Sequence, residues 1–244
     1  MKTTHFSRRG FLLGALAGAG VLTLGVRTAE AAAGSFEPNV WMRLEADGTL
    51  HLTCNRSEMG QGVRSSIPAL LAAELGADLA RIQVVQAPGN PVYGDQNTDG
   101  SRSIRAQYTM LRQMAAVGRT VLEQAGAKQL GVAVGTVVCR EHAVIHEPSG
   151  RRVDFGELTA AAAKAPVPDP DSVTLREVPA SGWDLPLVDA PAWVTGQARF
   201  GADIVRENMV IAVIVRPPVL GSTVVSFDDS AARAKKGVVD VIQL

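Results

Sequence analysis

Two glycine-containing loops carry the residue types best suited to chemistry in this chain of 244 residues. Loop 1 spans residues 57–62 and reads Ser-Glu-Met-Gly-Gln-Gly, and loop 2 spans residues 97–103 and reads Asn-Thr-Asp-Gly-Ser-Arg-Ser. Each loop follows a plausible strand and precedes an apolar pattern of helical spacing. Free N–H groups and the positive end of the dipole at a helix N-terminus attract anions. The two loops are therefore predicted to form two walls of one pocket for an anionic cofactor.

The candidate cofactor-binding residues are backbone-exposing glycines, side chains with hydrogen-bonding groups, and one arginine. They are Gly60, Gln61, Gly62, Thr98, Gly100, Ser101, Arg102 and Ser103. A plainer interpretation stands beside this one: the glycines permit turns of positive φ, Gln61 caps a helix, and Arg102 lies in solvent.

No catalytic residue and no metal ligand from the protein is assigned. The histidines have no acids or thiols at ligand spacing, and His51, His142 and His146 are predicted to be surface residues of strands.

Alternating and helical patterns supply the elements that position the loops. Loop 1 is predicted to follow the second strand of a hairpin, Thr49–Asn55, whose turn is Asp47-Gly48. It leads into a helix that begins at Val63 and stops at Gly76.

Loop 2 is predicted to come after a strand over Arg81–Gln86 and a loop over Pro88–Gln96. It leads into a helix from about Ile104 to Gln124, with Ser101 or Ser103 as the N-cap.

The sequence as a whole predicts an α+β fold that is divided into several segments. Residues 34–163 form the first domain and end with a hairpin over 136–147 and a helix over Phe155–Ala163. Residues 164–192 are a proline-rich extended linker. Residues 193–244 begin a second β-rich domain, with a helix over Asp228–Lys235. Its predicted strands are Ala198–Asp203, Met209–Val215, Thr223–Phe227 and Val238–Ile242.

Composition excludes several classes of protein. Lysine plus arginine and aspartate plus glutamate balance at 24 each, so nothing points to nucleic acid as a partner. Two cysteines, Cys54 and Cys139, are too few for an iron–sulfur cluster, which needs about four ligands. Both are predicted to be core thiols.

Residues 1–33 are typical of a twin-arginine signal peptide. Arg8 and Arg9 precede an apolar run over Phe11–Val26, and small residues at 29–33 resemble a cleavage site. A membrane anchor helix is the alternative, although the run is short for that. Because the twin-arginine route exports folded proteins, often with a cofactor in place, this segment predicts a periplasmic location, with or without association to the inner membrane.

The two loop sequences together resemble the large molybdenum-binding subunit of the xanthine oxidase family. The similar branch contains the isoquinoline 1-oxidoreductase β subunit and membrane-associated aldehyde dehydrogenases. Val194–Gly201 and Arg216–Val219 resemble the opening of that family's hammerhead α/β domain. The resemblance therefore covers an N-terminal fragment of a family member.

The resemblance implies part of a molybdopterin-binding αβ domain followed by the start of a hammerhead-type domain. Loops 1 and 2 would contact the dithiolene pterin and its phosphate tail in the molybdenum cofactor, as molybdopterin or its cytosine dinucleotide. The implied partners are a small iron–sulfur subunit that carries the [2Fe-2S] cluster, a c-type cytochrome subunit, and the remaining C-terminal part of the large subunit.

The implied activity is oxidation of an aldehyde or N-heterocycle with water as the oxygen source and transfer of electrons to the iron–sulfur partner. The family's catalytic glutamate lies beyond residue 244, and neither Glu58 nor Glu74 matches it. The chain alone is therefore expected to be inactive. The alternative is a non-catalytic periplasmic module for cofactor binding or assembly.

Two residues depart from the family pattern. Asp99 stands where a small residue is usual, and Trp193 stands where a basic residue is usual. An acid at position 99 costs Coulomb energy beside an anionic cofactor unless its side chain turns away.

Overall fold

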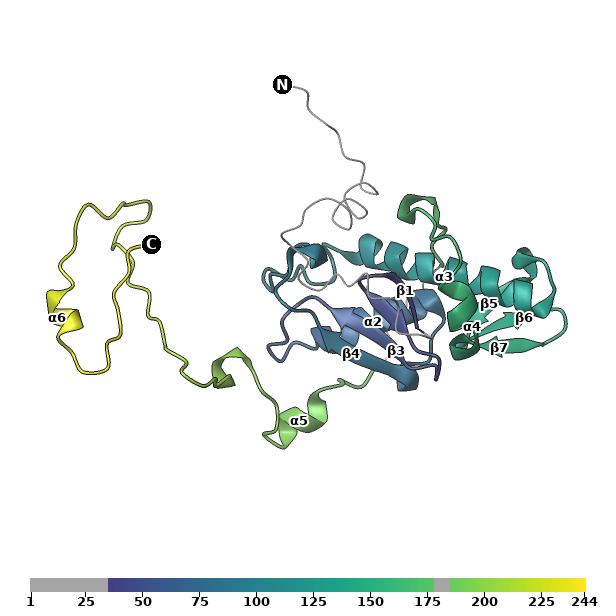
Figure 1. Ribbon diagram of the computed structural model, residues 1–244, viewed down its shortest axis with the longest axis horizontal. Helices are drawn as coiled ribbons and strands as arrows, with labels where there is room; N and C mark the ends of the chain where they lie inside the picture. The colour runs from purple at the N-terminus through teal and green to yellow at the C-terminus, as the bar shows by residue number, and fades with distance from the viewer. Residues whose placement is uncertain (1–34, 178–184) are drawn as a thin grey trace, which may run out of the picture. The chain divides into compact units, whose positions relative to one another are not determined.

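A computed structural model of the chain describes residues 35–177 and 185–244 (Figure 1). The chain divides into two units, one that ends at Ala198 and one that begins at Arg199. The predicted signal peptide lies outside the described residues. Within the described part of the chain, no helix is long and apolar enough to cross a membrane.

A four-stranded sheet positions both loops. Its strand order is β1 (Phe36–Asn39), β2 (Met42–Leu44), β3 (Leu50–Cys54) and β4 (Ile82–Gln86). The first three strands pair antiparallel, whereas β3 and β4 run parallel and are connected through helix α2, Val63–Leu75. Because parallel strands end at the same edge of a sheet, the segments that leave β3 and β4 begin side by side.

A second, antiparallel sheet contains β5 (Val137–Arg140), β6 (Ala143–His146) and β7 (Arg152–Asp154). Helix α4, Phe155–Ala162, follows β7 directly. Asp154 accepts a hydrogen bond from the N–H of Gly156, and Glu157 completes a capping box.

Helix α3, Tyr108–Leu130, packs against α2, α4 and strands of both sheets (Figure 1). The buried core therefore runs through both sheets. Cys54 and Cys139 are both fully buried in this core, as predicted, and burial raises the pKa of each thiol.

Most predicted elements of this unit are confirmed, and so is the α+β fold class. Helix α2 ends at Gly76, whose φ of 77° is the left-handed conformation that glycine adopts readily. Strands β1 and β7, of four and three residues, were not predicted from the sequence.

The predicted start of the second long helix is wrong. Helix α3 begins at Tyr108 with Gln107 as its N-cap, so neither Ser101 nor Ser103 caps it. The positive φ angles of Gly100, 49°, and Ser101, 55°, delay the helix, and turns fill the residues between. The helix also continues past Gln124 to Leu130.

The prediction that His142 lies on the surface is wrong. Its side chain is buried, with Nε2 2.8 Å from the carbonyl oxygen of Gly48, and its Nδ1 accepts the N–H of Asp78 at 3.2 Å. These partners place the ring proton on Nε2. Burial lowers the pKa of His142, so the ring is neutral and joins the two sheets.

Residues 199–244, all of which are described, contain no strand. Their regular elements are a 3₁₀ turn, Gly201–Asp203, and helix α6, Ser230–Arg233, which is shorter than predicted. The four strands predicted in this part of the chain are therefore wrong for this structure. Strands need a partner edge and a covered face, but Ile211, Val213 and Val215 remain 86%, 84% and 90% exposed.

Candidate cofactor site

Loops 1 and 2 lie against each other, as predicted. The hydroxyl of Thr98 in loop 2 donates to the carbonyl oxygen of Ser57 in loop 1 at 3.1 Å. The buried guanidinium of Arg56, just before loop 1, donates to the carbonyl oxygen of Asn97. The two walls are thus joined by direct hydrogen bonds.

A buried amide pair fixes the bases of the loops. Asn55 donates to Oε1 of Gln107 at 3.0 Å, and Gln107 donates back to Oδ1 of Asn55 at 3.1 Å. Asn55 also donates to the carbonyl oxygens of Tyr93 and Asp95. Neither residue of this pair was predicted from the sequence to belong to the site. The position of Asn55, at the end of a buried strand, was the available signal.

The carboxylate of Glu58 occupies the N-terminus of α2. Its Oε1 accepts from the N–H groups of Gly60 at 2.8 Å and Gly62 at 3.0 Å, and its Oε2 accepts from Arg64 at 3.1 Å. Partial burial raises the pKa of Glu58. The hydrogen bonds from backbone N–H groups, those of Gly62 and Arg64 first, have the larger combined effect and hold the pKa below its usual value. The N-terminus of α2 does bind an anion, as predicted, but that anion is the carboxylate of Glu58.

Gln61 bonds within its own loop in this structure. Its Oε1 accepts from the N–H of Met59 at 2.7 Å, and its Nε2 donates to the carbonyl oxygen of Ser57 at 2.9 Å. The amide must therefore exchange these partners if it is to contact a cofactor.

Gly60 and Gly62 both have positive φ, 97° and 85°. A Cβ at Gly60 would meet no atom within 4 Å, whereas a Cβ at Gly62 would lie 2.7 Å from Cδ2 of Leu187. Gly60 therefore lies on the open side of loop 1, whereas Gly62 packs against the side chain of Leu187.

Arg102 is paired with acids of its own loop region. Its guanidinium donates from Nε and Nη2 to Oδ1 of Asp99, at 2.9 and 2.7 Å, and Nη1 lies 3.6 Å from Oδ2 of Asp95. The hydrogen bond to Asp99 is the main reason that the pKa of Arg102 is raised. Asp99, the departure from the family pattern, is thus neutralised by Arg102.

The remaining predicted residues of loop 2 offer free donors. Within the described residues, the hydroxyl and N–H groups of Ser101 and Ser103 make no hydrogen bond, and neither does the N–H of Gly100. An anionic cofactor prefers such groups, because N–H and O–H bonds to a charged oxygen are stronger than neutral ones.

The predicted residues of loops 1 and 2 fit an anionic cofactor, except that the N-terminus of α2 is not free to bind its phosphate groups. Loop 2 supplies free N–H and hydroxyl donors, and Gly60 supplies an open backbone surface, whereas the N–H groups of Gly62 and Arg64 at the N-terminus of α2 are already bound to Glu58. The structure therefore favours loop 2 over α2 for the phosphate groups.

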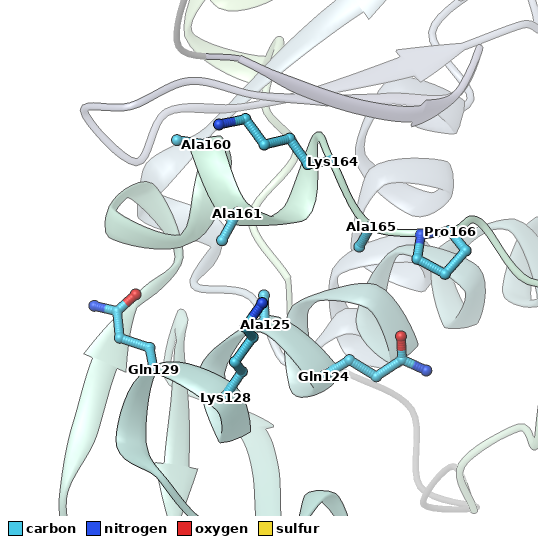
Figure 2. Close-up of a pocket in the computed structure, with 9 residues that line it drawn as sticks. All are labelled: Gln124, Ala125, Lys128, Gln129, Ala160, Ala161, Lys164, Ala165 and Pro166. Atoms are coloured by element: carbon cyan, nitrogen blue, oxygen red, sulfur yellow. The ribbon is translucent and has the colours of Figure 1, made fainter.

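A shallow groove between α3 and α4 is a weaker candidate site. Figure 2 shows its lining: Gln124, Ala125, Lys128, Gln129, Ala160, Ala161, Lys164, Ala165 and Pro166. It contains no predicted site residue, no acid and no nucleophile other than lysine. In the described residues, no group of three His, Cys, Asp or Glu side chains is placed to hold a metal ion.

Comparison with known proteins decides the family. Residues 7–189 match the molybdopterin cofactor-binding domain. The chain belongs to this family. The predicted resemblance to the molybdenum-binding subunits of the xanthine oxidase family is thereby confirmed, and the molybdenum cofactor is the ligand of this molybdopterin cofactor-binding domain.

Two relatives that match this chain are more than 30% identical to it. The beta subunit of isoquinoline 1-oxidoreductase from Brevundimonas diminuta is 32% identical over 296 residues, which cover 100% of this chain and 37% of the relative. The membrane-bound aldehyde dehydrogenase (pyrroloquinoline-quinone) of Gluconacetobacter polyoxogenes is 31% identical, over 96% of this chain and 32% of the relative. The chain thus spans about a third of the length of these relatives.

A more distant similarity is to a solved structure. The crystal structure of quinoline 2-oxidoreductase from Pseudomonas putida 86 superposes with a TM-score of 0.41 at 18% identity, over 53% of this chain and 17% of that one. The match is again to a small part of a longer protein.

Proposed function

We propose that this chain is the molybdopterin-binding portion of an exported molybdenum hydroxylase. The enzyme oxidises an aldehyde or N-heterocycle, takes its oxygen from water and passes electrons to an iron–sulfur partner subunit. The observation that supports this most is the hydrogen-bonded pair of loops, with free donors in loop 2, in a molybdopterin cofactor-binding domain.

The chain's own residues would bind and orient the cofactor. Gly60 would let the pterin approach the backbone of loop 1, and Ser101 and Ser103 would donate to the phosphate groups. Thr98 would hold the two loops together through Ser57. When bound, the cofactor supplies the metal centre for oxidation. Gln61 would reach it only after leaving its partners Met59 and Ser57.

Labelled water tests the proposed reaction. The chain is to be assembled with the remaining C-terminal part of the large subunit and the iron–sulfur partner, and given an N-heterocycle in ¹⁸O-water, because an aldehyde would exchange its carbonyl oxygen with water without the enzyme. We expect the label in the product. Unlabelled product would contradict the proposal, and cofactor binding without turnover would favour a non-catalytic cofactor-binding module.

The chain alone is expected not to turn over the same substrates with an artificial electron acceptor. A general base contributes about 10²–10⁴-fold to a rate, and the base that the family resemblance implies lies outside these 244 residues. Turnover by the purified chain at a rate that follows its molybdenum content would contradict this prediction.

Export is the second part of the proposal and rests on Arg8 and Arg9 before the apolar run. Changing both to lysine should leave the protein in the cytoplasm, because the twin-arginine route reads that pair. Cell fractionation measures the result. An unchanged periplasmic yield would contradict export by this route.

A further inference from the structure

Loop 1 is held in shape by a carboxylate of its own. Glu58 accepts hydrogen bonds from the backbone N–H groups of Gly60, Gly62 and Arg64, at distances of 2.8–3.1 Å, and so connects loop 1 to the first turn of α2. Gln61 reinforces the turn from the other side through Met59 and Ser57. Glu58 thus accepts three of the five hydrogen bonds that hold the turn.

The Glu58 carboxylate and a phosphate of the cofactor cannot share the same donors. Both are anions, and like charges in contact repel. Among the described residues, the hydrogen bonds of Glu58 all go to Gly60, Gly62 and Arg64, so the carboxylate leaves the donors of loop 2 untouched. Gly60 keeps its open side while its N–H is bound to Glu58.

We propose that Glu58 is a positioning residue, whose carboxylate serves as a built-in anion that holds loop 1 in the conformation that accepts the cofactor. The cofactor then meets the open side of Gly60, and its phosphate groups bind loop 2. This inference rests on the proposed function, and it predicts that removing Glu58 weakens cofactor binding. If Glu58 instead competed with the cofactor, its removal would strengthen binding.

Chemical rescue tests the role of Glu58. The full chain, free of cofactor, is incubated with molybdenum cofactor, and molybdenum and pterin are measured per folded chain. We expect affinity to fall about tenfold or more in Glu58→Ala and less in Glu58→Gln, because one charge-assisted acceptor of three N–H groups is lost or weakened. Sodium formate should restore binding to Glu58→Ala by filling the vacated position, whereas sodium chloride at equal ionic strength should not.

Glu147→Ala is the matched control, since Glu147 is an exposed glutamate whose ion pair with Arg140 is 3.7 Å long. It should bind cofactor as the wild type does, with or without formate. Amide hydrogen exchange gives a readout without cofactor: Gly60, Gly62 and Arg64 should exchange faster in Glu58→Ala and slow again in formate.

The outcomes separate the two proposals. A wild-type chain that binds no cofactor contradicts the proposed function. Folded Glu58→Ala and Glu58→Gln chains that bind as well as a loaded wild type, or better, contradict only the role of Glu58. So does a loss of binding that formate does not reverse.

Discussion

Replacing Glu74 by glutamine is expected to lower the free energy of unfolding by about 3–5 kcal/mol. The Glu74 carboxylate is fully buried, and it pairs with Arg112 at 2.7 Å and with Arg119 at 3.1 Å. It also accepts the N–H of Arg176 at 2.9 Å. Loss of its charge removes the counterion that these two buried guanidinium groups share, which is why the expected effect is large. Urea denaturation measures it.

The same ion cluster holds the segment that follows α4. Arg112 and Arg119 donate to the carbonyl oxygens of Arg176 and Thr174, so part of the predicted linker is fastened to α3. Glu147→Gln is the control, because its exposed ion pair contributes at most about 1 kcal/mol. A loss below about 1 kcal/mol in Glu74→Gln would show that the cluster does not stabilise the fold.

Gly76→Ala is expected to lower the free energy of unfolding by about 2–5 kcal/mol, the sum of two effects. Its left-handed conformation, φ 77°, costs a residue with a Cβ roughly 1–2 kcal/mol. The new Cβ would also lie 2.7 Å from the carbonyl carbon of Cys139 and still closer to its oxygen, and overpacking of this kind costs about 1–3 kcal/mol. Thermal or urea unfolding measures the total.

Gly131→Ala separates the two effects. Gly131 ends α3 with φ 67°, but a Cβ there would meet nothing within 4 Å. The free energy of unfolding of Gly131→Ala should therefore fall only by the conformational strain, roughly 1–2 kcal/mol. Equal losses in the two variants would mean that the close approach to Cys139 contributes nothing.

Local patterns were sufficient for the elements next to loop 1. Helix α2 was predictable because its apolar spacing is regular and Gly76 provides a stop signal. The adjacency of the loops was predicted because they lie close together in the sequence, and the parallel pairing of β3 with β4 brings them together in the fold.

Features that depend on tertiary contacts were not predictable in this way. The start of α3 moves to Tyr108, and Gln107 before it is paired with Asn55, 52 positions away. His142 is buried because the carbonyl oxygen of Gly48 lies beside it. The bond from Glu58 to the N-terminus of α2 is local, but it competes with an external anion, and the sequence contains no signal that decides between them.

Molybdenum and pterin content per folded chain, with folding checked by circular dichroism, tests most directly whether the two loops hold the cofactor. A valine side chain at Gly60 would fill the open side of loop 1, so Gly60→Val should carry almost no cofactor. Ser101→Ala should bind it about tenfold to a hundredfold more weakly, the effect of one hydrogen bond to a charged group. Gly150→Val, with φ 69° and nothing within 4 Å of its Cβ, imposes similar backbone strain outside the loops and should keep its cofactor. If folded Gly60→Val and Ser101→Ala chains both retain the wild-type content, the loops are turns and do not hold the cofactor.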